Sequence, residues 1–272
     1  MKVGISTFVT DEGMLPAALA EAVEERGFDA LFVAEHSHIP VRRETPYPLG
    51  GDLPRPYFRA ADPFVALAAA ATVTSRLLLG TGISLLVQRD VIHTAKQVSS
   101  VDVLSGGRVI FGVGVGWNRE EMRDHGTDPR TRGALLDERI LALKAIWTQD
   151  EAEFHGEYVD FAPMFQWPKP VSKPHPPVYI GGDSASAAAR AGRLGDGWLP
   201  FAVRDPRQVE AQLEARPSGV PVTVTSASPD EELFAAYAEA GAERVTLALP
   251  VEPEARTLRR LDALAVFAAR YE

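Results

Sequence analysis

Eight short apolar segments rich in Val, Ile, Leu and Phe recur along the chain, and a longer helical pattern follows each of them. Buried strands joined by helical crossovers form a parallel sheet that is covered by helices, and eight such units favour a closed barrel over an open sheet. We therefore expect residues 1–272 to form one (β/α)₈ barrel domain of the α/β class. The expected strands are residues 2–7, 30–34, 77–86, 109–115, 177–181, 197–201, 220–225 and 244–249.

Proline and small polar residues indicate where several of the expected helices begin. Proline is tolerated in the first helical turn, and a preceding Asp or Ser can cap the free N–H groups there. Asp62-Pro63, Asp205-Pro206 and Ser228-Pro229 fit this pattern. The expected helices are residues 15–26, 63–75, 92–104, 131–148, 184–194, 206–215, 229–240 and 253–271.

Two connections are too long to be simple turns. Residues 37–61 form an insertion after the second strand, and the proline-rich residues 160–177 precede the fifth strand. Long loops in a compact domain are commonly functional, so we expect both to wall the active site. Their aromatic side chains predict an apolar or aromatic pocket. These side chains are Tyr47, Tyr57, Phe58, Phe165 and Trp167.

Composition narrows the class of protein. Lys and Arg total 28 against 37 Asp and Glu, a net charge of −9 that argues against a nucleic-acid partner. The absence of Cys excludes disulfides, thiolate metal ligands and cysteine nucleophiles. The N-terminus lacks the apolar core of a signal peptide, and the most apolar later stretch is shorter than the roughly 20 residues that span a bilayer. We expect a cytoplasmic protein that does not enter membranes.

In a barrel of this kind the chemistry lies at the carboxyl-terminal ends of the strands. Gly181-Gly182-Asp183-Ser184 ends the fifth strand and opens a helix. Free N–H groups and the helix dipole there favour a phosphate, with the Ser184 hydroxyl as a further donor. The alternative is a plain turn, in which glycine supplies a positive φ and Asp183 or Ser184 caps the helix.

Alternating glycines at the end of the fourth strand form a second candidate site. Gly112, Gly114 and Gly116 do not have the G-x-G-x-x-G spacing of a Rossmann dinucleotide site. We expect the backbone here to lie flat against a ring system, while Asn118 offers its amide to carbonyl or hydroxyl groups. The alternative is that the glycines serve only close packing.

The third candidate, His36-Ser37-His38, follows the second strand. Two imidazoles spaced two residues apart on a strand face one side, as in the metal pair of a barrel hydrolase. The later strand ends hold no histidine that would complete such a site, so we expect no metal. We expect His36 to act as a hydrogen-bond donor or general acid beside a cofactor, with a structural role as the alternative. Glu35 either orients His36 or pairs with an arginine.

An ordered set of motifs across residues 1–202 resembles the bacterial luciferase-like monooxygenase superfamily. Ala34-Glu35-His36 is most similar to the branch that uses the deazaflavin coenzyme F420. The motifs are Leu79-Gly80-Thr81-Gly82-Ile83, Thr94-Ala95-Lys96-Gln97, Asp102-Val103-Leu104-Ser105-Gly106-Gly107-Arg108, Gly112-Val113-Gly114-Val115-Gly116-Trp117-Asn118, Gly181-Gly182 and Gly195-Asp196-Gly197-Trp198.

The resemblance implies a barrel whose flavin or deazaflavin lies across the strand ends. It implies a cis peptide bond between Gly82 and Ile83 and a phosphate at Gly181-Gly182. Pairing through early helices is also implied, and the Ala-rich helix over residues 63–75 is a candidate surface for a homodimer. The expected cofactor contacts are Gly82, Ile83, Gly114, Val115, Asn118, Gly181, Gly182, Asp183 and Ser184.

For function, the resemblance implies hydride transfer between the deazaflavin C5 and a small organic substrate, with Glu35 and His36 as catalytic residues. Related glucose-6-phosphate dehydrogenases have a catalytic Glu after the strand-four glycines, and the matching residue here is Val115. Reduction of a C=C, C=N or C=O bond is therefore the expected reaction. An FMN-dependent monooxygenase and a non-catalytic flavin-binding barrel are the alternatives.

Overall fold

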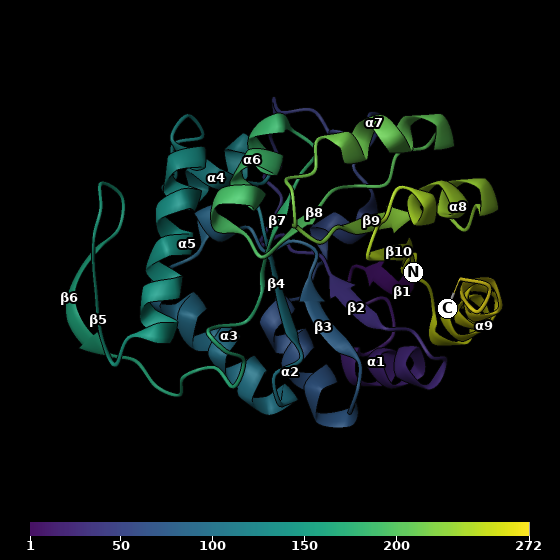
Figure 1. The fold of residues 1–272 in the computed structure, drawn as a ribbon, viewed down its shortest axis with the longest axis horizontal. Helices are drawn as coiled ribbons and strands as arrows, with labels where there is room; N and C mark the ends of the chain where they lie inside the picture. Colours follow the sequence, from purple (N-terminus) through teal and green to yellow (C-terminus); the bar gives the residue numbers. More distant parts are fainter. Residues whose placement is uncertain (272) are drawn as a thin grey trace.

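Apolar residues on both faces of eight short strands produce a parallel barrel inside a ring of helices (Figure 1). The computed structural model describes residues 1–271, and its eight-stranded sheet has the order β8-β7-β4-β3-β2-β1-β10-β9. Bridges from Trp198 to Val222 and from Phe201 to Thr225 join the two edge strands. The barrel strands are β1 (Lys2–Thr7), β2 (Ala30–Val33), β3 (Leu78–Thr81), β4 (Val109–Val113), β7 (Val178–Gly181), β8 (Gly197–Leu199), β9 (Thr223–Ala227) and β10 (Arg244–Ala248). The predicted barrel is confirmed.

Two separate apolar cores show how the barrel is filled. The inner core contains Phe32, Ile110, Tyr179 and Leu199, with Ile83 packed against it. The outer core is much larger and lies between the strands and the helices. Alternate residues of one strand enter different cores, as Ile110 and Phe111 of β4 do, because successive side chains point to opposite faces.

The helices follow the strands largely as predicted. Asp62 caps α2, where its carboxylate accepts hydrogen bonds from the Phe64 and Val65 N–H groups. Ser228 is not a cap, because α8 begins later and Asp230 accepts from the Leu233 N–H instead. The α-helices are α1 (Pro16–Glu25), α2 (Pro63–Val73), α3 (Val91–Ser105), α4 (Arg119–Asp124), α5 (Arg132–Thr148), α6 (Ala185–Leu194), α7 (Val209–Glu214), α8 (Glu231–Glu239) and α9 (Glu254–Ala268). Short 3-10 helices cover Arg55–Phe58, Leu86–Gln88 and Pro206–Gln208.

The third strand is shorter than the apolar run that predicted it. It ends at Thr81, and the chain continues through a cis peptide bond between Gly82 and Ile83, as expected, into the 3-10 helix. Beyond Thr81 the regular pairing is interrupted but not lost, because Ser84 still bridges to Val113 of β4, and the Glu35 carboxylate accepts the Leu85 N–H at 2.7 Å. Continuous hydrophobicity therefore marks burial in this segment but does not set the strand boundary.

The prediction that residues 160–177 wall the active site is wrong. Their first part forms β6 (Asp160–Phe165), which pairs with β5 (Glu151–His155) in an antiparallel hairpin beside α5 (Figure 1). The rest runs past the amino-terminal end of β4, where Ser172 donates to Asp102. Phe165 and Trp167 are 74% and 54% exposed on this outer side, so they do not line a pocket at the strand ends.

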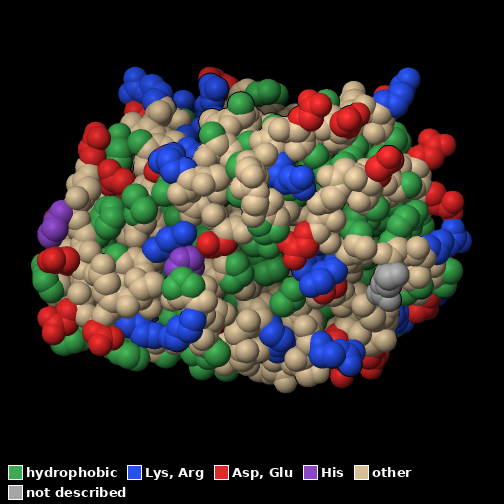
Figure 2. Space-filling model, in the orientation of Figure 1, with side chains coloured by type: hydrophobic (Ala, Val, Ile, Leu, Met, Phe, Trp, Pro, Cys, Tyr) green, Lys and Arg blue, Asp and Glu red, His purple; other side chains and the backbone are tan. Residues whose placement is uncertain are grey.

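Acidic and basic side chains are interspersed on the face seen in Figure 2. In the described residues 1–271, every helix is too short or too polar to cross a bilayer. The alanines of α2 pack against α1 and α3, while Val65 and Val73 are exposed on the same helix. Whether this helix pairs two copies of the chain stays a prediction.

Candidate active site

A buried His–Glu pair lies at the carboxyl-terminal end of β2. His36 follows this strand, and its Nδ1 lies 2.8 Å from Oε2 of Glu121 on α4. Their side chains are only 5% and 0% exposed. A carboxylate accepts hydrogen bonds, so Nδ1 carries a proton, and Nε2 is left as the nitrogen that can exchange a proton with a ligand.

The same carboxylate connects His36 to groups at the surface. Glu121 Oε1 accepts from the Ser37 N–H at 3.1 Å and lies 3.4 Å from the Ser37 hydroxyl. That hydroxyl lies 2.6 Å from His125 Nε2 and 2.9 Å from His38 Nδ1. The two histidines of the His36-Ser37-His38 segment thus have different partners, because His38 pairs with Asp124 and not with Glu121.

Glu35 pairs with an arginine, which is the second of its two predicted roles. Its carboxylate accepts from Arg89 Nε at 2.5 Å as well as from the Leu85 N–H. Arg89 also binds Asp62, the N-cap of α2. Glu35 is therefore a positioning residue that joins β2 to the segment after β3, rather than a group directed at His36.

Aromatic side chains cover the His36 ring. Its centroid lies 5.1 Å from that of Tyr57 and 5.8 Å from that of Trp117. Phe8 and Tyr47 extend the cluster, and the Tyr47 and Tyr57 hydroxyls are 3.3 Å apart. Burial raises the pKa of Tyr57 above its usual range. Residues 37–61 thus form one wall of the site, as predicted, and bring Tyr47 and Tyr57 to it.

The glycines that end β4 and β7 are explained by packing. A Cβ at Gly112 would overlap the Thr81 carbonyl, and one at Gly114 or Gly181 would overlap the Ile83 side chain. Ile83 in turn closes the top of the inner core. Close packing, the alternative stated for these glycines, therefore accounts for them. The Val115 side chain packs against the outer core.

In the part of the chain that the structure describes, three polar atoms near these glycines are buried without a hydrogen-bond partner. They are Ser84 Oγ, Gln88 Nε2 and Asn118 Nδ2. Asn118 uses its carbonyl oxygen to cap α4, where it accepts from the Glu121 N–H at 3.3 Å. Ser84 bridges to Val113 of β4 through its backbone. Buried polar atoms are rarely left unpaired, so these three fit a ligand that carries polar groups.

Gly182 has a φ of 114°, and Ser184 caps α6 by accepting from the Ala187 N–H at 3.2 Å. Asp183 accepts from the Phe201 N–H at 2.9 Å, and loss of water contacts raises the pKa of its carboxyl. The helix cap and the anion site are compatible, because the first N–H groups of α6 have no partner within the helix. Asp183 is turned toward β8, so it is not a direct phosphate ligand.

Glu121 and Trp117 were missing from the predicted site residues. Glu121 lies in a charged helical stretch that resembles a solvated surface, and its partner His36 is 85 residues away in sequence. A signal was present for Trp117, because it belongs to the motif that carried the family resemblance. The structure was needed to show that both face His36.

Comparison with known proteins supports the family. Residues 16–219 match the luciferase-like monooxygenases, and the chain belongs to this family. An uncharacterized protein of Mycobacterium tuberculosis is 39% identical over 265 residues, which cover 92% of each chain. The monooxygenase RslO1 from Streptomyces bottropensis superposes with a TM-score of 0.78 at 20% identity and covers 100% of this chain and 99% of its own.

Two further relatives differ in the cofactor that they use. An F420-dependent glucose-6-phosphate dehydrogenase of Nakamurella multipartita is 32% identical over 70% of this chain and 52% of its own. An FMNH2-dependent dimethylsulfone monooxygenase of Pseudomonas putida is 40% identical over 38% of this chain and 29% of its own. The relatives are thus oxidoreductases and monooxygenases with either a deazaflavin or a flavin.

Proposed function

We propose that this protein is an F420-dependent oxidoreductase that transfers a hydride between the deazaflavin and a small organic substrate. The observation that carries the proposal is the buried His36, whose Nδ1 is held by Glu121 and whose ring lies under Tyr57 and Trp117. Reduction of a polarised double bond needs one hydride and one proton, and a fixed imidazole in an apolar site can supply the proton. The F420-dependent relative also matches a larger share of the chain than the FMN-dependent one.

The residues present fit such a cofactor. Ser84 Oγ, Gln88 Nε2 and Asn118 Nδ2 are buried without partners, and ring carbonyls or side-chain hydroxyls of a deazaflavin would satisfy them. The exposed start of α6 at Gly182–Ser184 would hold the phosphate. When bound, the deazaflavin supplies or accepts the hydride at C5.

The chain itself orients the substrate and moves the proton. Glu121 fixes the His36 ring so that Nε2 is the atom that exchanges a proton, and Tyr57 and Trp117 restrict access of water to it. Ser37 connects Glu121 by hydrogen bonds to His125 and His38 at the surface. The direction of hydride transfer and the identity of the substrate depend on the molecule that binds beside His36.

Cofactor binding provides the direct test. In a fluorescence titration with F420 and, in parallel, with FMN, we expect saturable binding of F420 and at least tenfold weaker binding of FMN. Ser84→Ala is expected to weaken F420 binding about three- to tenfold, because it removes one partner of a buried polar contact. Preferential binding of FMN would instead support the monooxygenase, which the FMN-dependent relative favours as second candidate.

The role of His36 is tested separately. With a carbonyl or enone substrate found by screening with reduced F420, His36→Asn should lower kcat about 10²- to 10⁴-fold while the Kd for F420 stays within twofold. His155→Asn is the matched control, because His155 is exposed on the β5–β6 hairpin and pairs with Asp160. Equal turnover by His36→Asn and the unchanged protein would contradict the assignment.

A further inference from the structure

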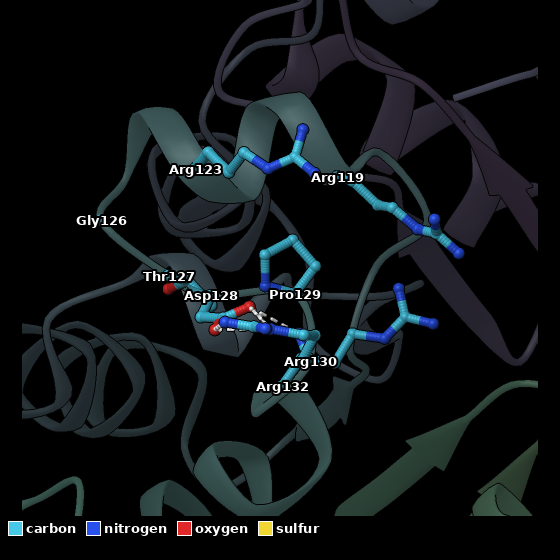
Figure 3. Close-up of a pocket in the computed structure, with 8 residues that line it drawn as sticks. All are labelled: Arg119, Arg123, Gly126, Thr127, Asp128, Pro129, Arg130 and Arg132. Carbon is cyan, nitrogen blue, oxygen red and sulfur yellow. Dashed lines mark hydrogen bonds and ion pairs between the residues drawn. The ribbon is translucent and has the colours of Figure 1, made fainter. Parts of the chain in front are cut away.

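A cleft rich in arginine lies between α4 and the start of α5. It has a volume of about 810 Å³, which is within the range of ligand sites in proteins. In Figure 3, Arg119 and Arg123 extend from α4, Pro129 lies in the middle, and Arg130 and Arg132 come from the opposite wall. The lining residues are Arg119, Arg123, Gly126, Thr127, Asp128, Pro129, Arg130 and Arg132.

The charge of this cleft is only partly compensated. Arg130 pairs with Asp128 at 2.7 Å, and Arg123 lies 3.6 Å from Glu120. Within residues 1–271, neither Arg119 nor Arg132 forms an ion pair with a carboxylate. The lining therefore carries four arginines and one aspartate in a protein whose net charge is −9. A local positive field of this kind attracts an anion that the rest of the surface repels.

The cleft belongs to the same end of the barrel as the candidate active site. Both of its walls come from the connection that follows β4 and leads to α5. Arg119 follows Asn118 directly and stands two residues before Glu121, the partner of His36. On the other side, the carbonyl of Gly133 accepts from Arg190 Nη2 at 3.3 Å, and Arg190 lies on α6, the helix that Ser184 caps.

The residue types in the cleft define the chemistry of its ligand. Aromatic and aliphatic side chains are scarce in the lining, so it does not suit a flat ring. Guanidinium groups bind carboxylates and phosphates through paired N–H donors, and several of them spread over one cleft suit a flexible chain with several negative charges. The anionic side chain of F420, a phosphate followed by glutamate carboxylates, has this character, whereas FMN ends at its phosphate.

We propose that the Arg119–Arg132 cleft binds the glutamate tail of F420 and thereby selects the deazaflavin over FMN. This inference rests on the proposed function, because it assumes that the ring lies beside His36. It adds a second binding region, outside the ring and phosphate sites, that recognises charge rather than aromatic surface.

The experiment compares F420 with its riboflavin-like fragment, which has the deazaflavin ring but neither phosphate nor tail. Dissociation constants are measured by fluorescence at low and at high salt. We expect the unchanged protein to bind F420 at least tenfold more tightly than the fragment at low salt, with a smaller ratio at high salt because exposed charges are screened. F420 preparations with one and with several glutamates separate the phosphate from the tail, and the longer tail should bind more tightly.

The double variant Arg119→Gln and Arg132→Gln should weaken binding of F420 about tenfold and leave binding of the fragment within twofold. Arg270→Gln is the control, because Arg270 is exposed on the last turn of the chain and pairs with Glu231. Equal loss for F420 and the fragment, or no dependence on tail length in the unchanged protein, would overturn the inference while the proposed function stands. Failure of both F420 and the fragment to bind would overturn the proposed function itself. The tail-length comparison needs no variant, so it decides even where the double variant does not fold.

Discussion

The two ends of the barrel differ in the hydrogen-bond partners of their buried polar groups. At the amino-terminal end two arginines make many hydrogen bonds, although within residues 1–271 both amide atoms of the nearby Gln166 are buried without a partner. Arg108 donates to Ser105, Thr74, Leu77 and Ala71, mostly to their carbonyl oxygens. Arg244, only 1% exposed, contacts Asp29 and Thr223. These groups connect helices to the starts of strands, so this end contributes stability.

The carboxyl-terminal end is built differently. Ser84, Gln88 and Asn118 each keep a buried polar atom without a partner, and His36 keeps one nitrogen for a ligand. Within residues 1–271, Arg119 and Arg132 form no ion pair of the kind that joins Arg244 to Asp29. An unpaired buried polar group costs folding free energy, so the grouping of three such atoms near the ends of β3 and β4 fits an end that is organised around a ligand.

The largest effect that tests this comparison is expected at Arg244. Arg244→Met should lower the free energy of unfolding by about 2–3 kcal/mol, because it removes the buried partner of Asp29 and the contact with Thr223, while Lys2 still lies near Asp29. Urea denaturation measures the change as a lower midpoint at constant slope. As a control, Arg207→Met should leave the urea midpoint unchanged, since Arg207 is 89% exposed. A loss below about 1 kcal/mol at Arg244 would remove the contrast between the ends.

A smaller effect that depends on pH is expected at Glu24, also at the amino-terminal end. Burial alone would raise the pKa of this carboxyl, but the N–H groups of Arg76, Leu77 and Ser75 more than offset it and lower the pKa below 4.5. When the pKa of a carboxyl is lower in the folded than in the unfolded protein, its ionised form stabilises the fold. That contribution is present above pH 4.5 and is lost as the pH falls through the pKa of the folded protein.

Glu24→Gln should therefore cost about 1 kcal/mol at pH 7, a modest value because solvent competes for these donors. The difference in melting temperature between the two proteins should shrink as the pH is lowered from 6 to 3. A constant difference over this range would contradict the assigned role of the charge.

The smallest effect, with the opposite sign, is expected at Asp183 near the ligand end. Loss of water contacts raises the pKa of this carboxyl above 3.8. When the pKa of a carboxyl is higher in the folded than in the unfolded protein, its protonated form stabilises the fold. That contribution is complete below pH 3.8 and is lost as the pH rises through the pKa of the folded protein. Asp183→Asn keeps an oxygen for the Phe201 N–H and removes the charge.

At pH 7 we expect Asp183→Asn to raise the melting temperature slightly, which corresponds to a gain of less than about 0.5 kcal/mol in the free energy of unfolding. Near pH 3 we expect no effect. Thermal melts of both proteins at the two pH values measure this. If the effect of the Glu24 variant on melting temperature and that of the Asp183 variant change in opposite directions with pH, the two ends of the barrel differ as described. If both change in the same direction, the comparison fails.

Much of the barrel followed from local patterns. The β1 strand was predicted with its true bounds, and Asp62 was recognised as a cap because a polar side chain before a proline is a local signal. Errors arose where tertiary contacts override such signals. The third strand ends before its apolar run does, at the cis peptide bond between Gly82 and Ile83, and the β5–β6 hairpin was missed because Pro163 within β6 and the prolines after it indicate a loop.

The site divides in the same way. His36, Asn118 and the glycine segments were selected from the sequence because they follow strand ends, where the chemistry of such a barrel lies. The roles of Glu121 and Arg89 were not predictable, since each meets its partner across more than 50 residues of chain. Close packing was an alternative for the strand-four glycines, and the structure identifies the groups that require it: the Thr81 carbonyl at Gly112 and the Ile83 side chain at Gly114.

By itself, the sequence determined the architecture and the family, because alternation of strands and helices and short motifs are properties of neighbouring residues. The tertiary structure decided which groups act together: Glu121 with His36, Glu35 with Arg89, and Arg119 with Arg132 around one cleft. Hydrogen bonds and charges act over a few ångströms in space, and distance along the chain does not report that proximity.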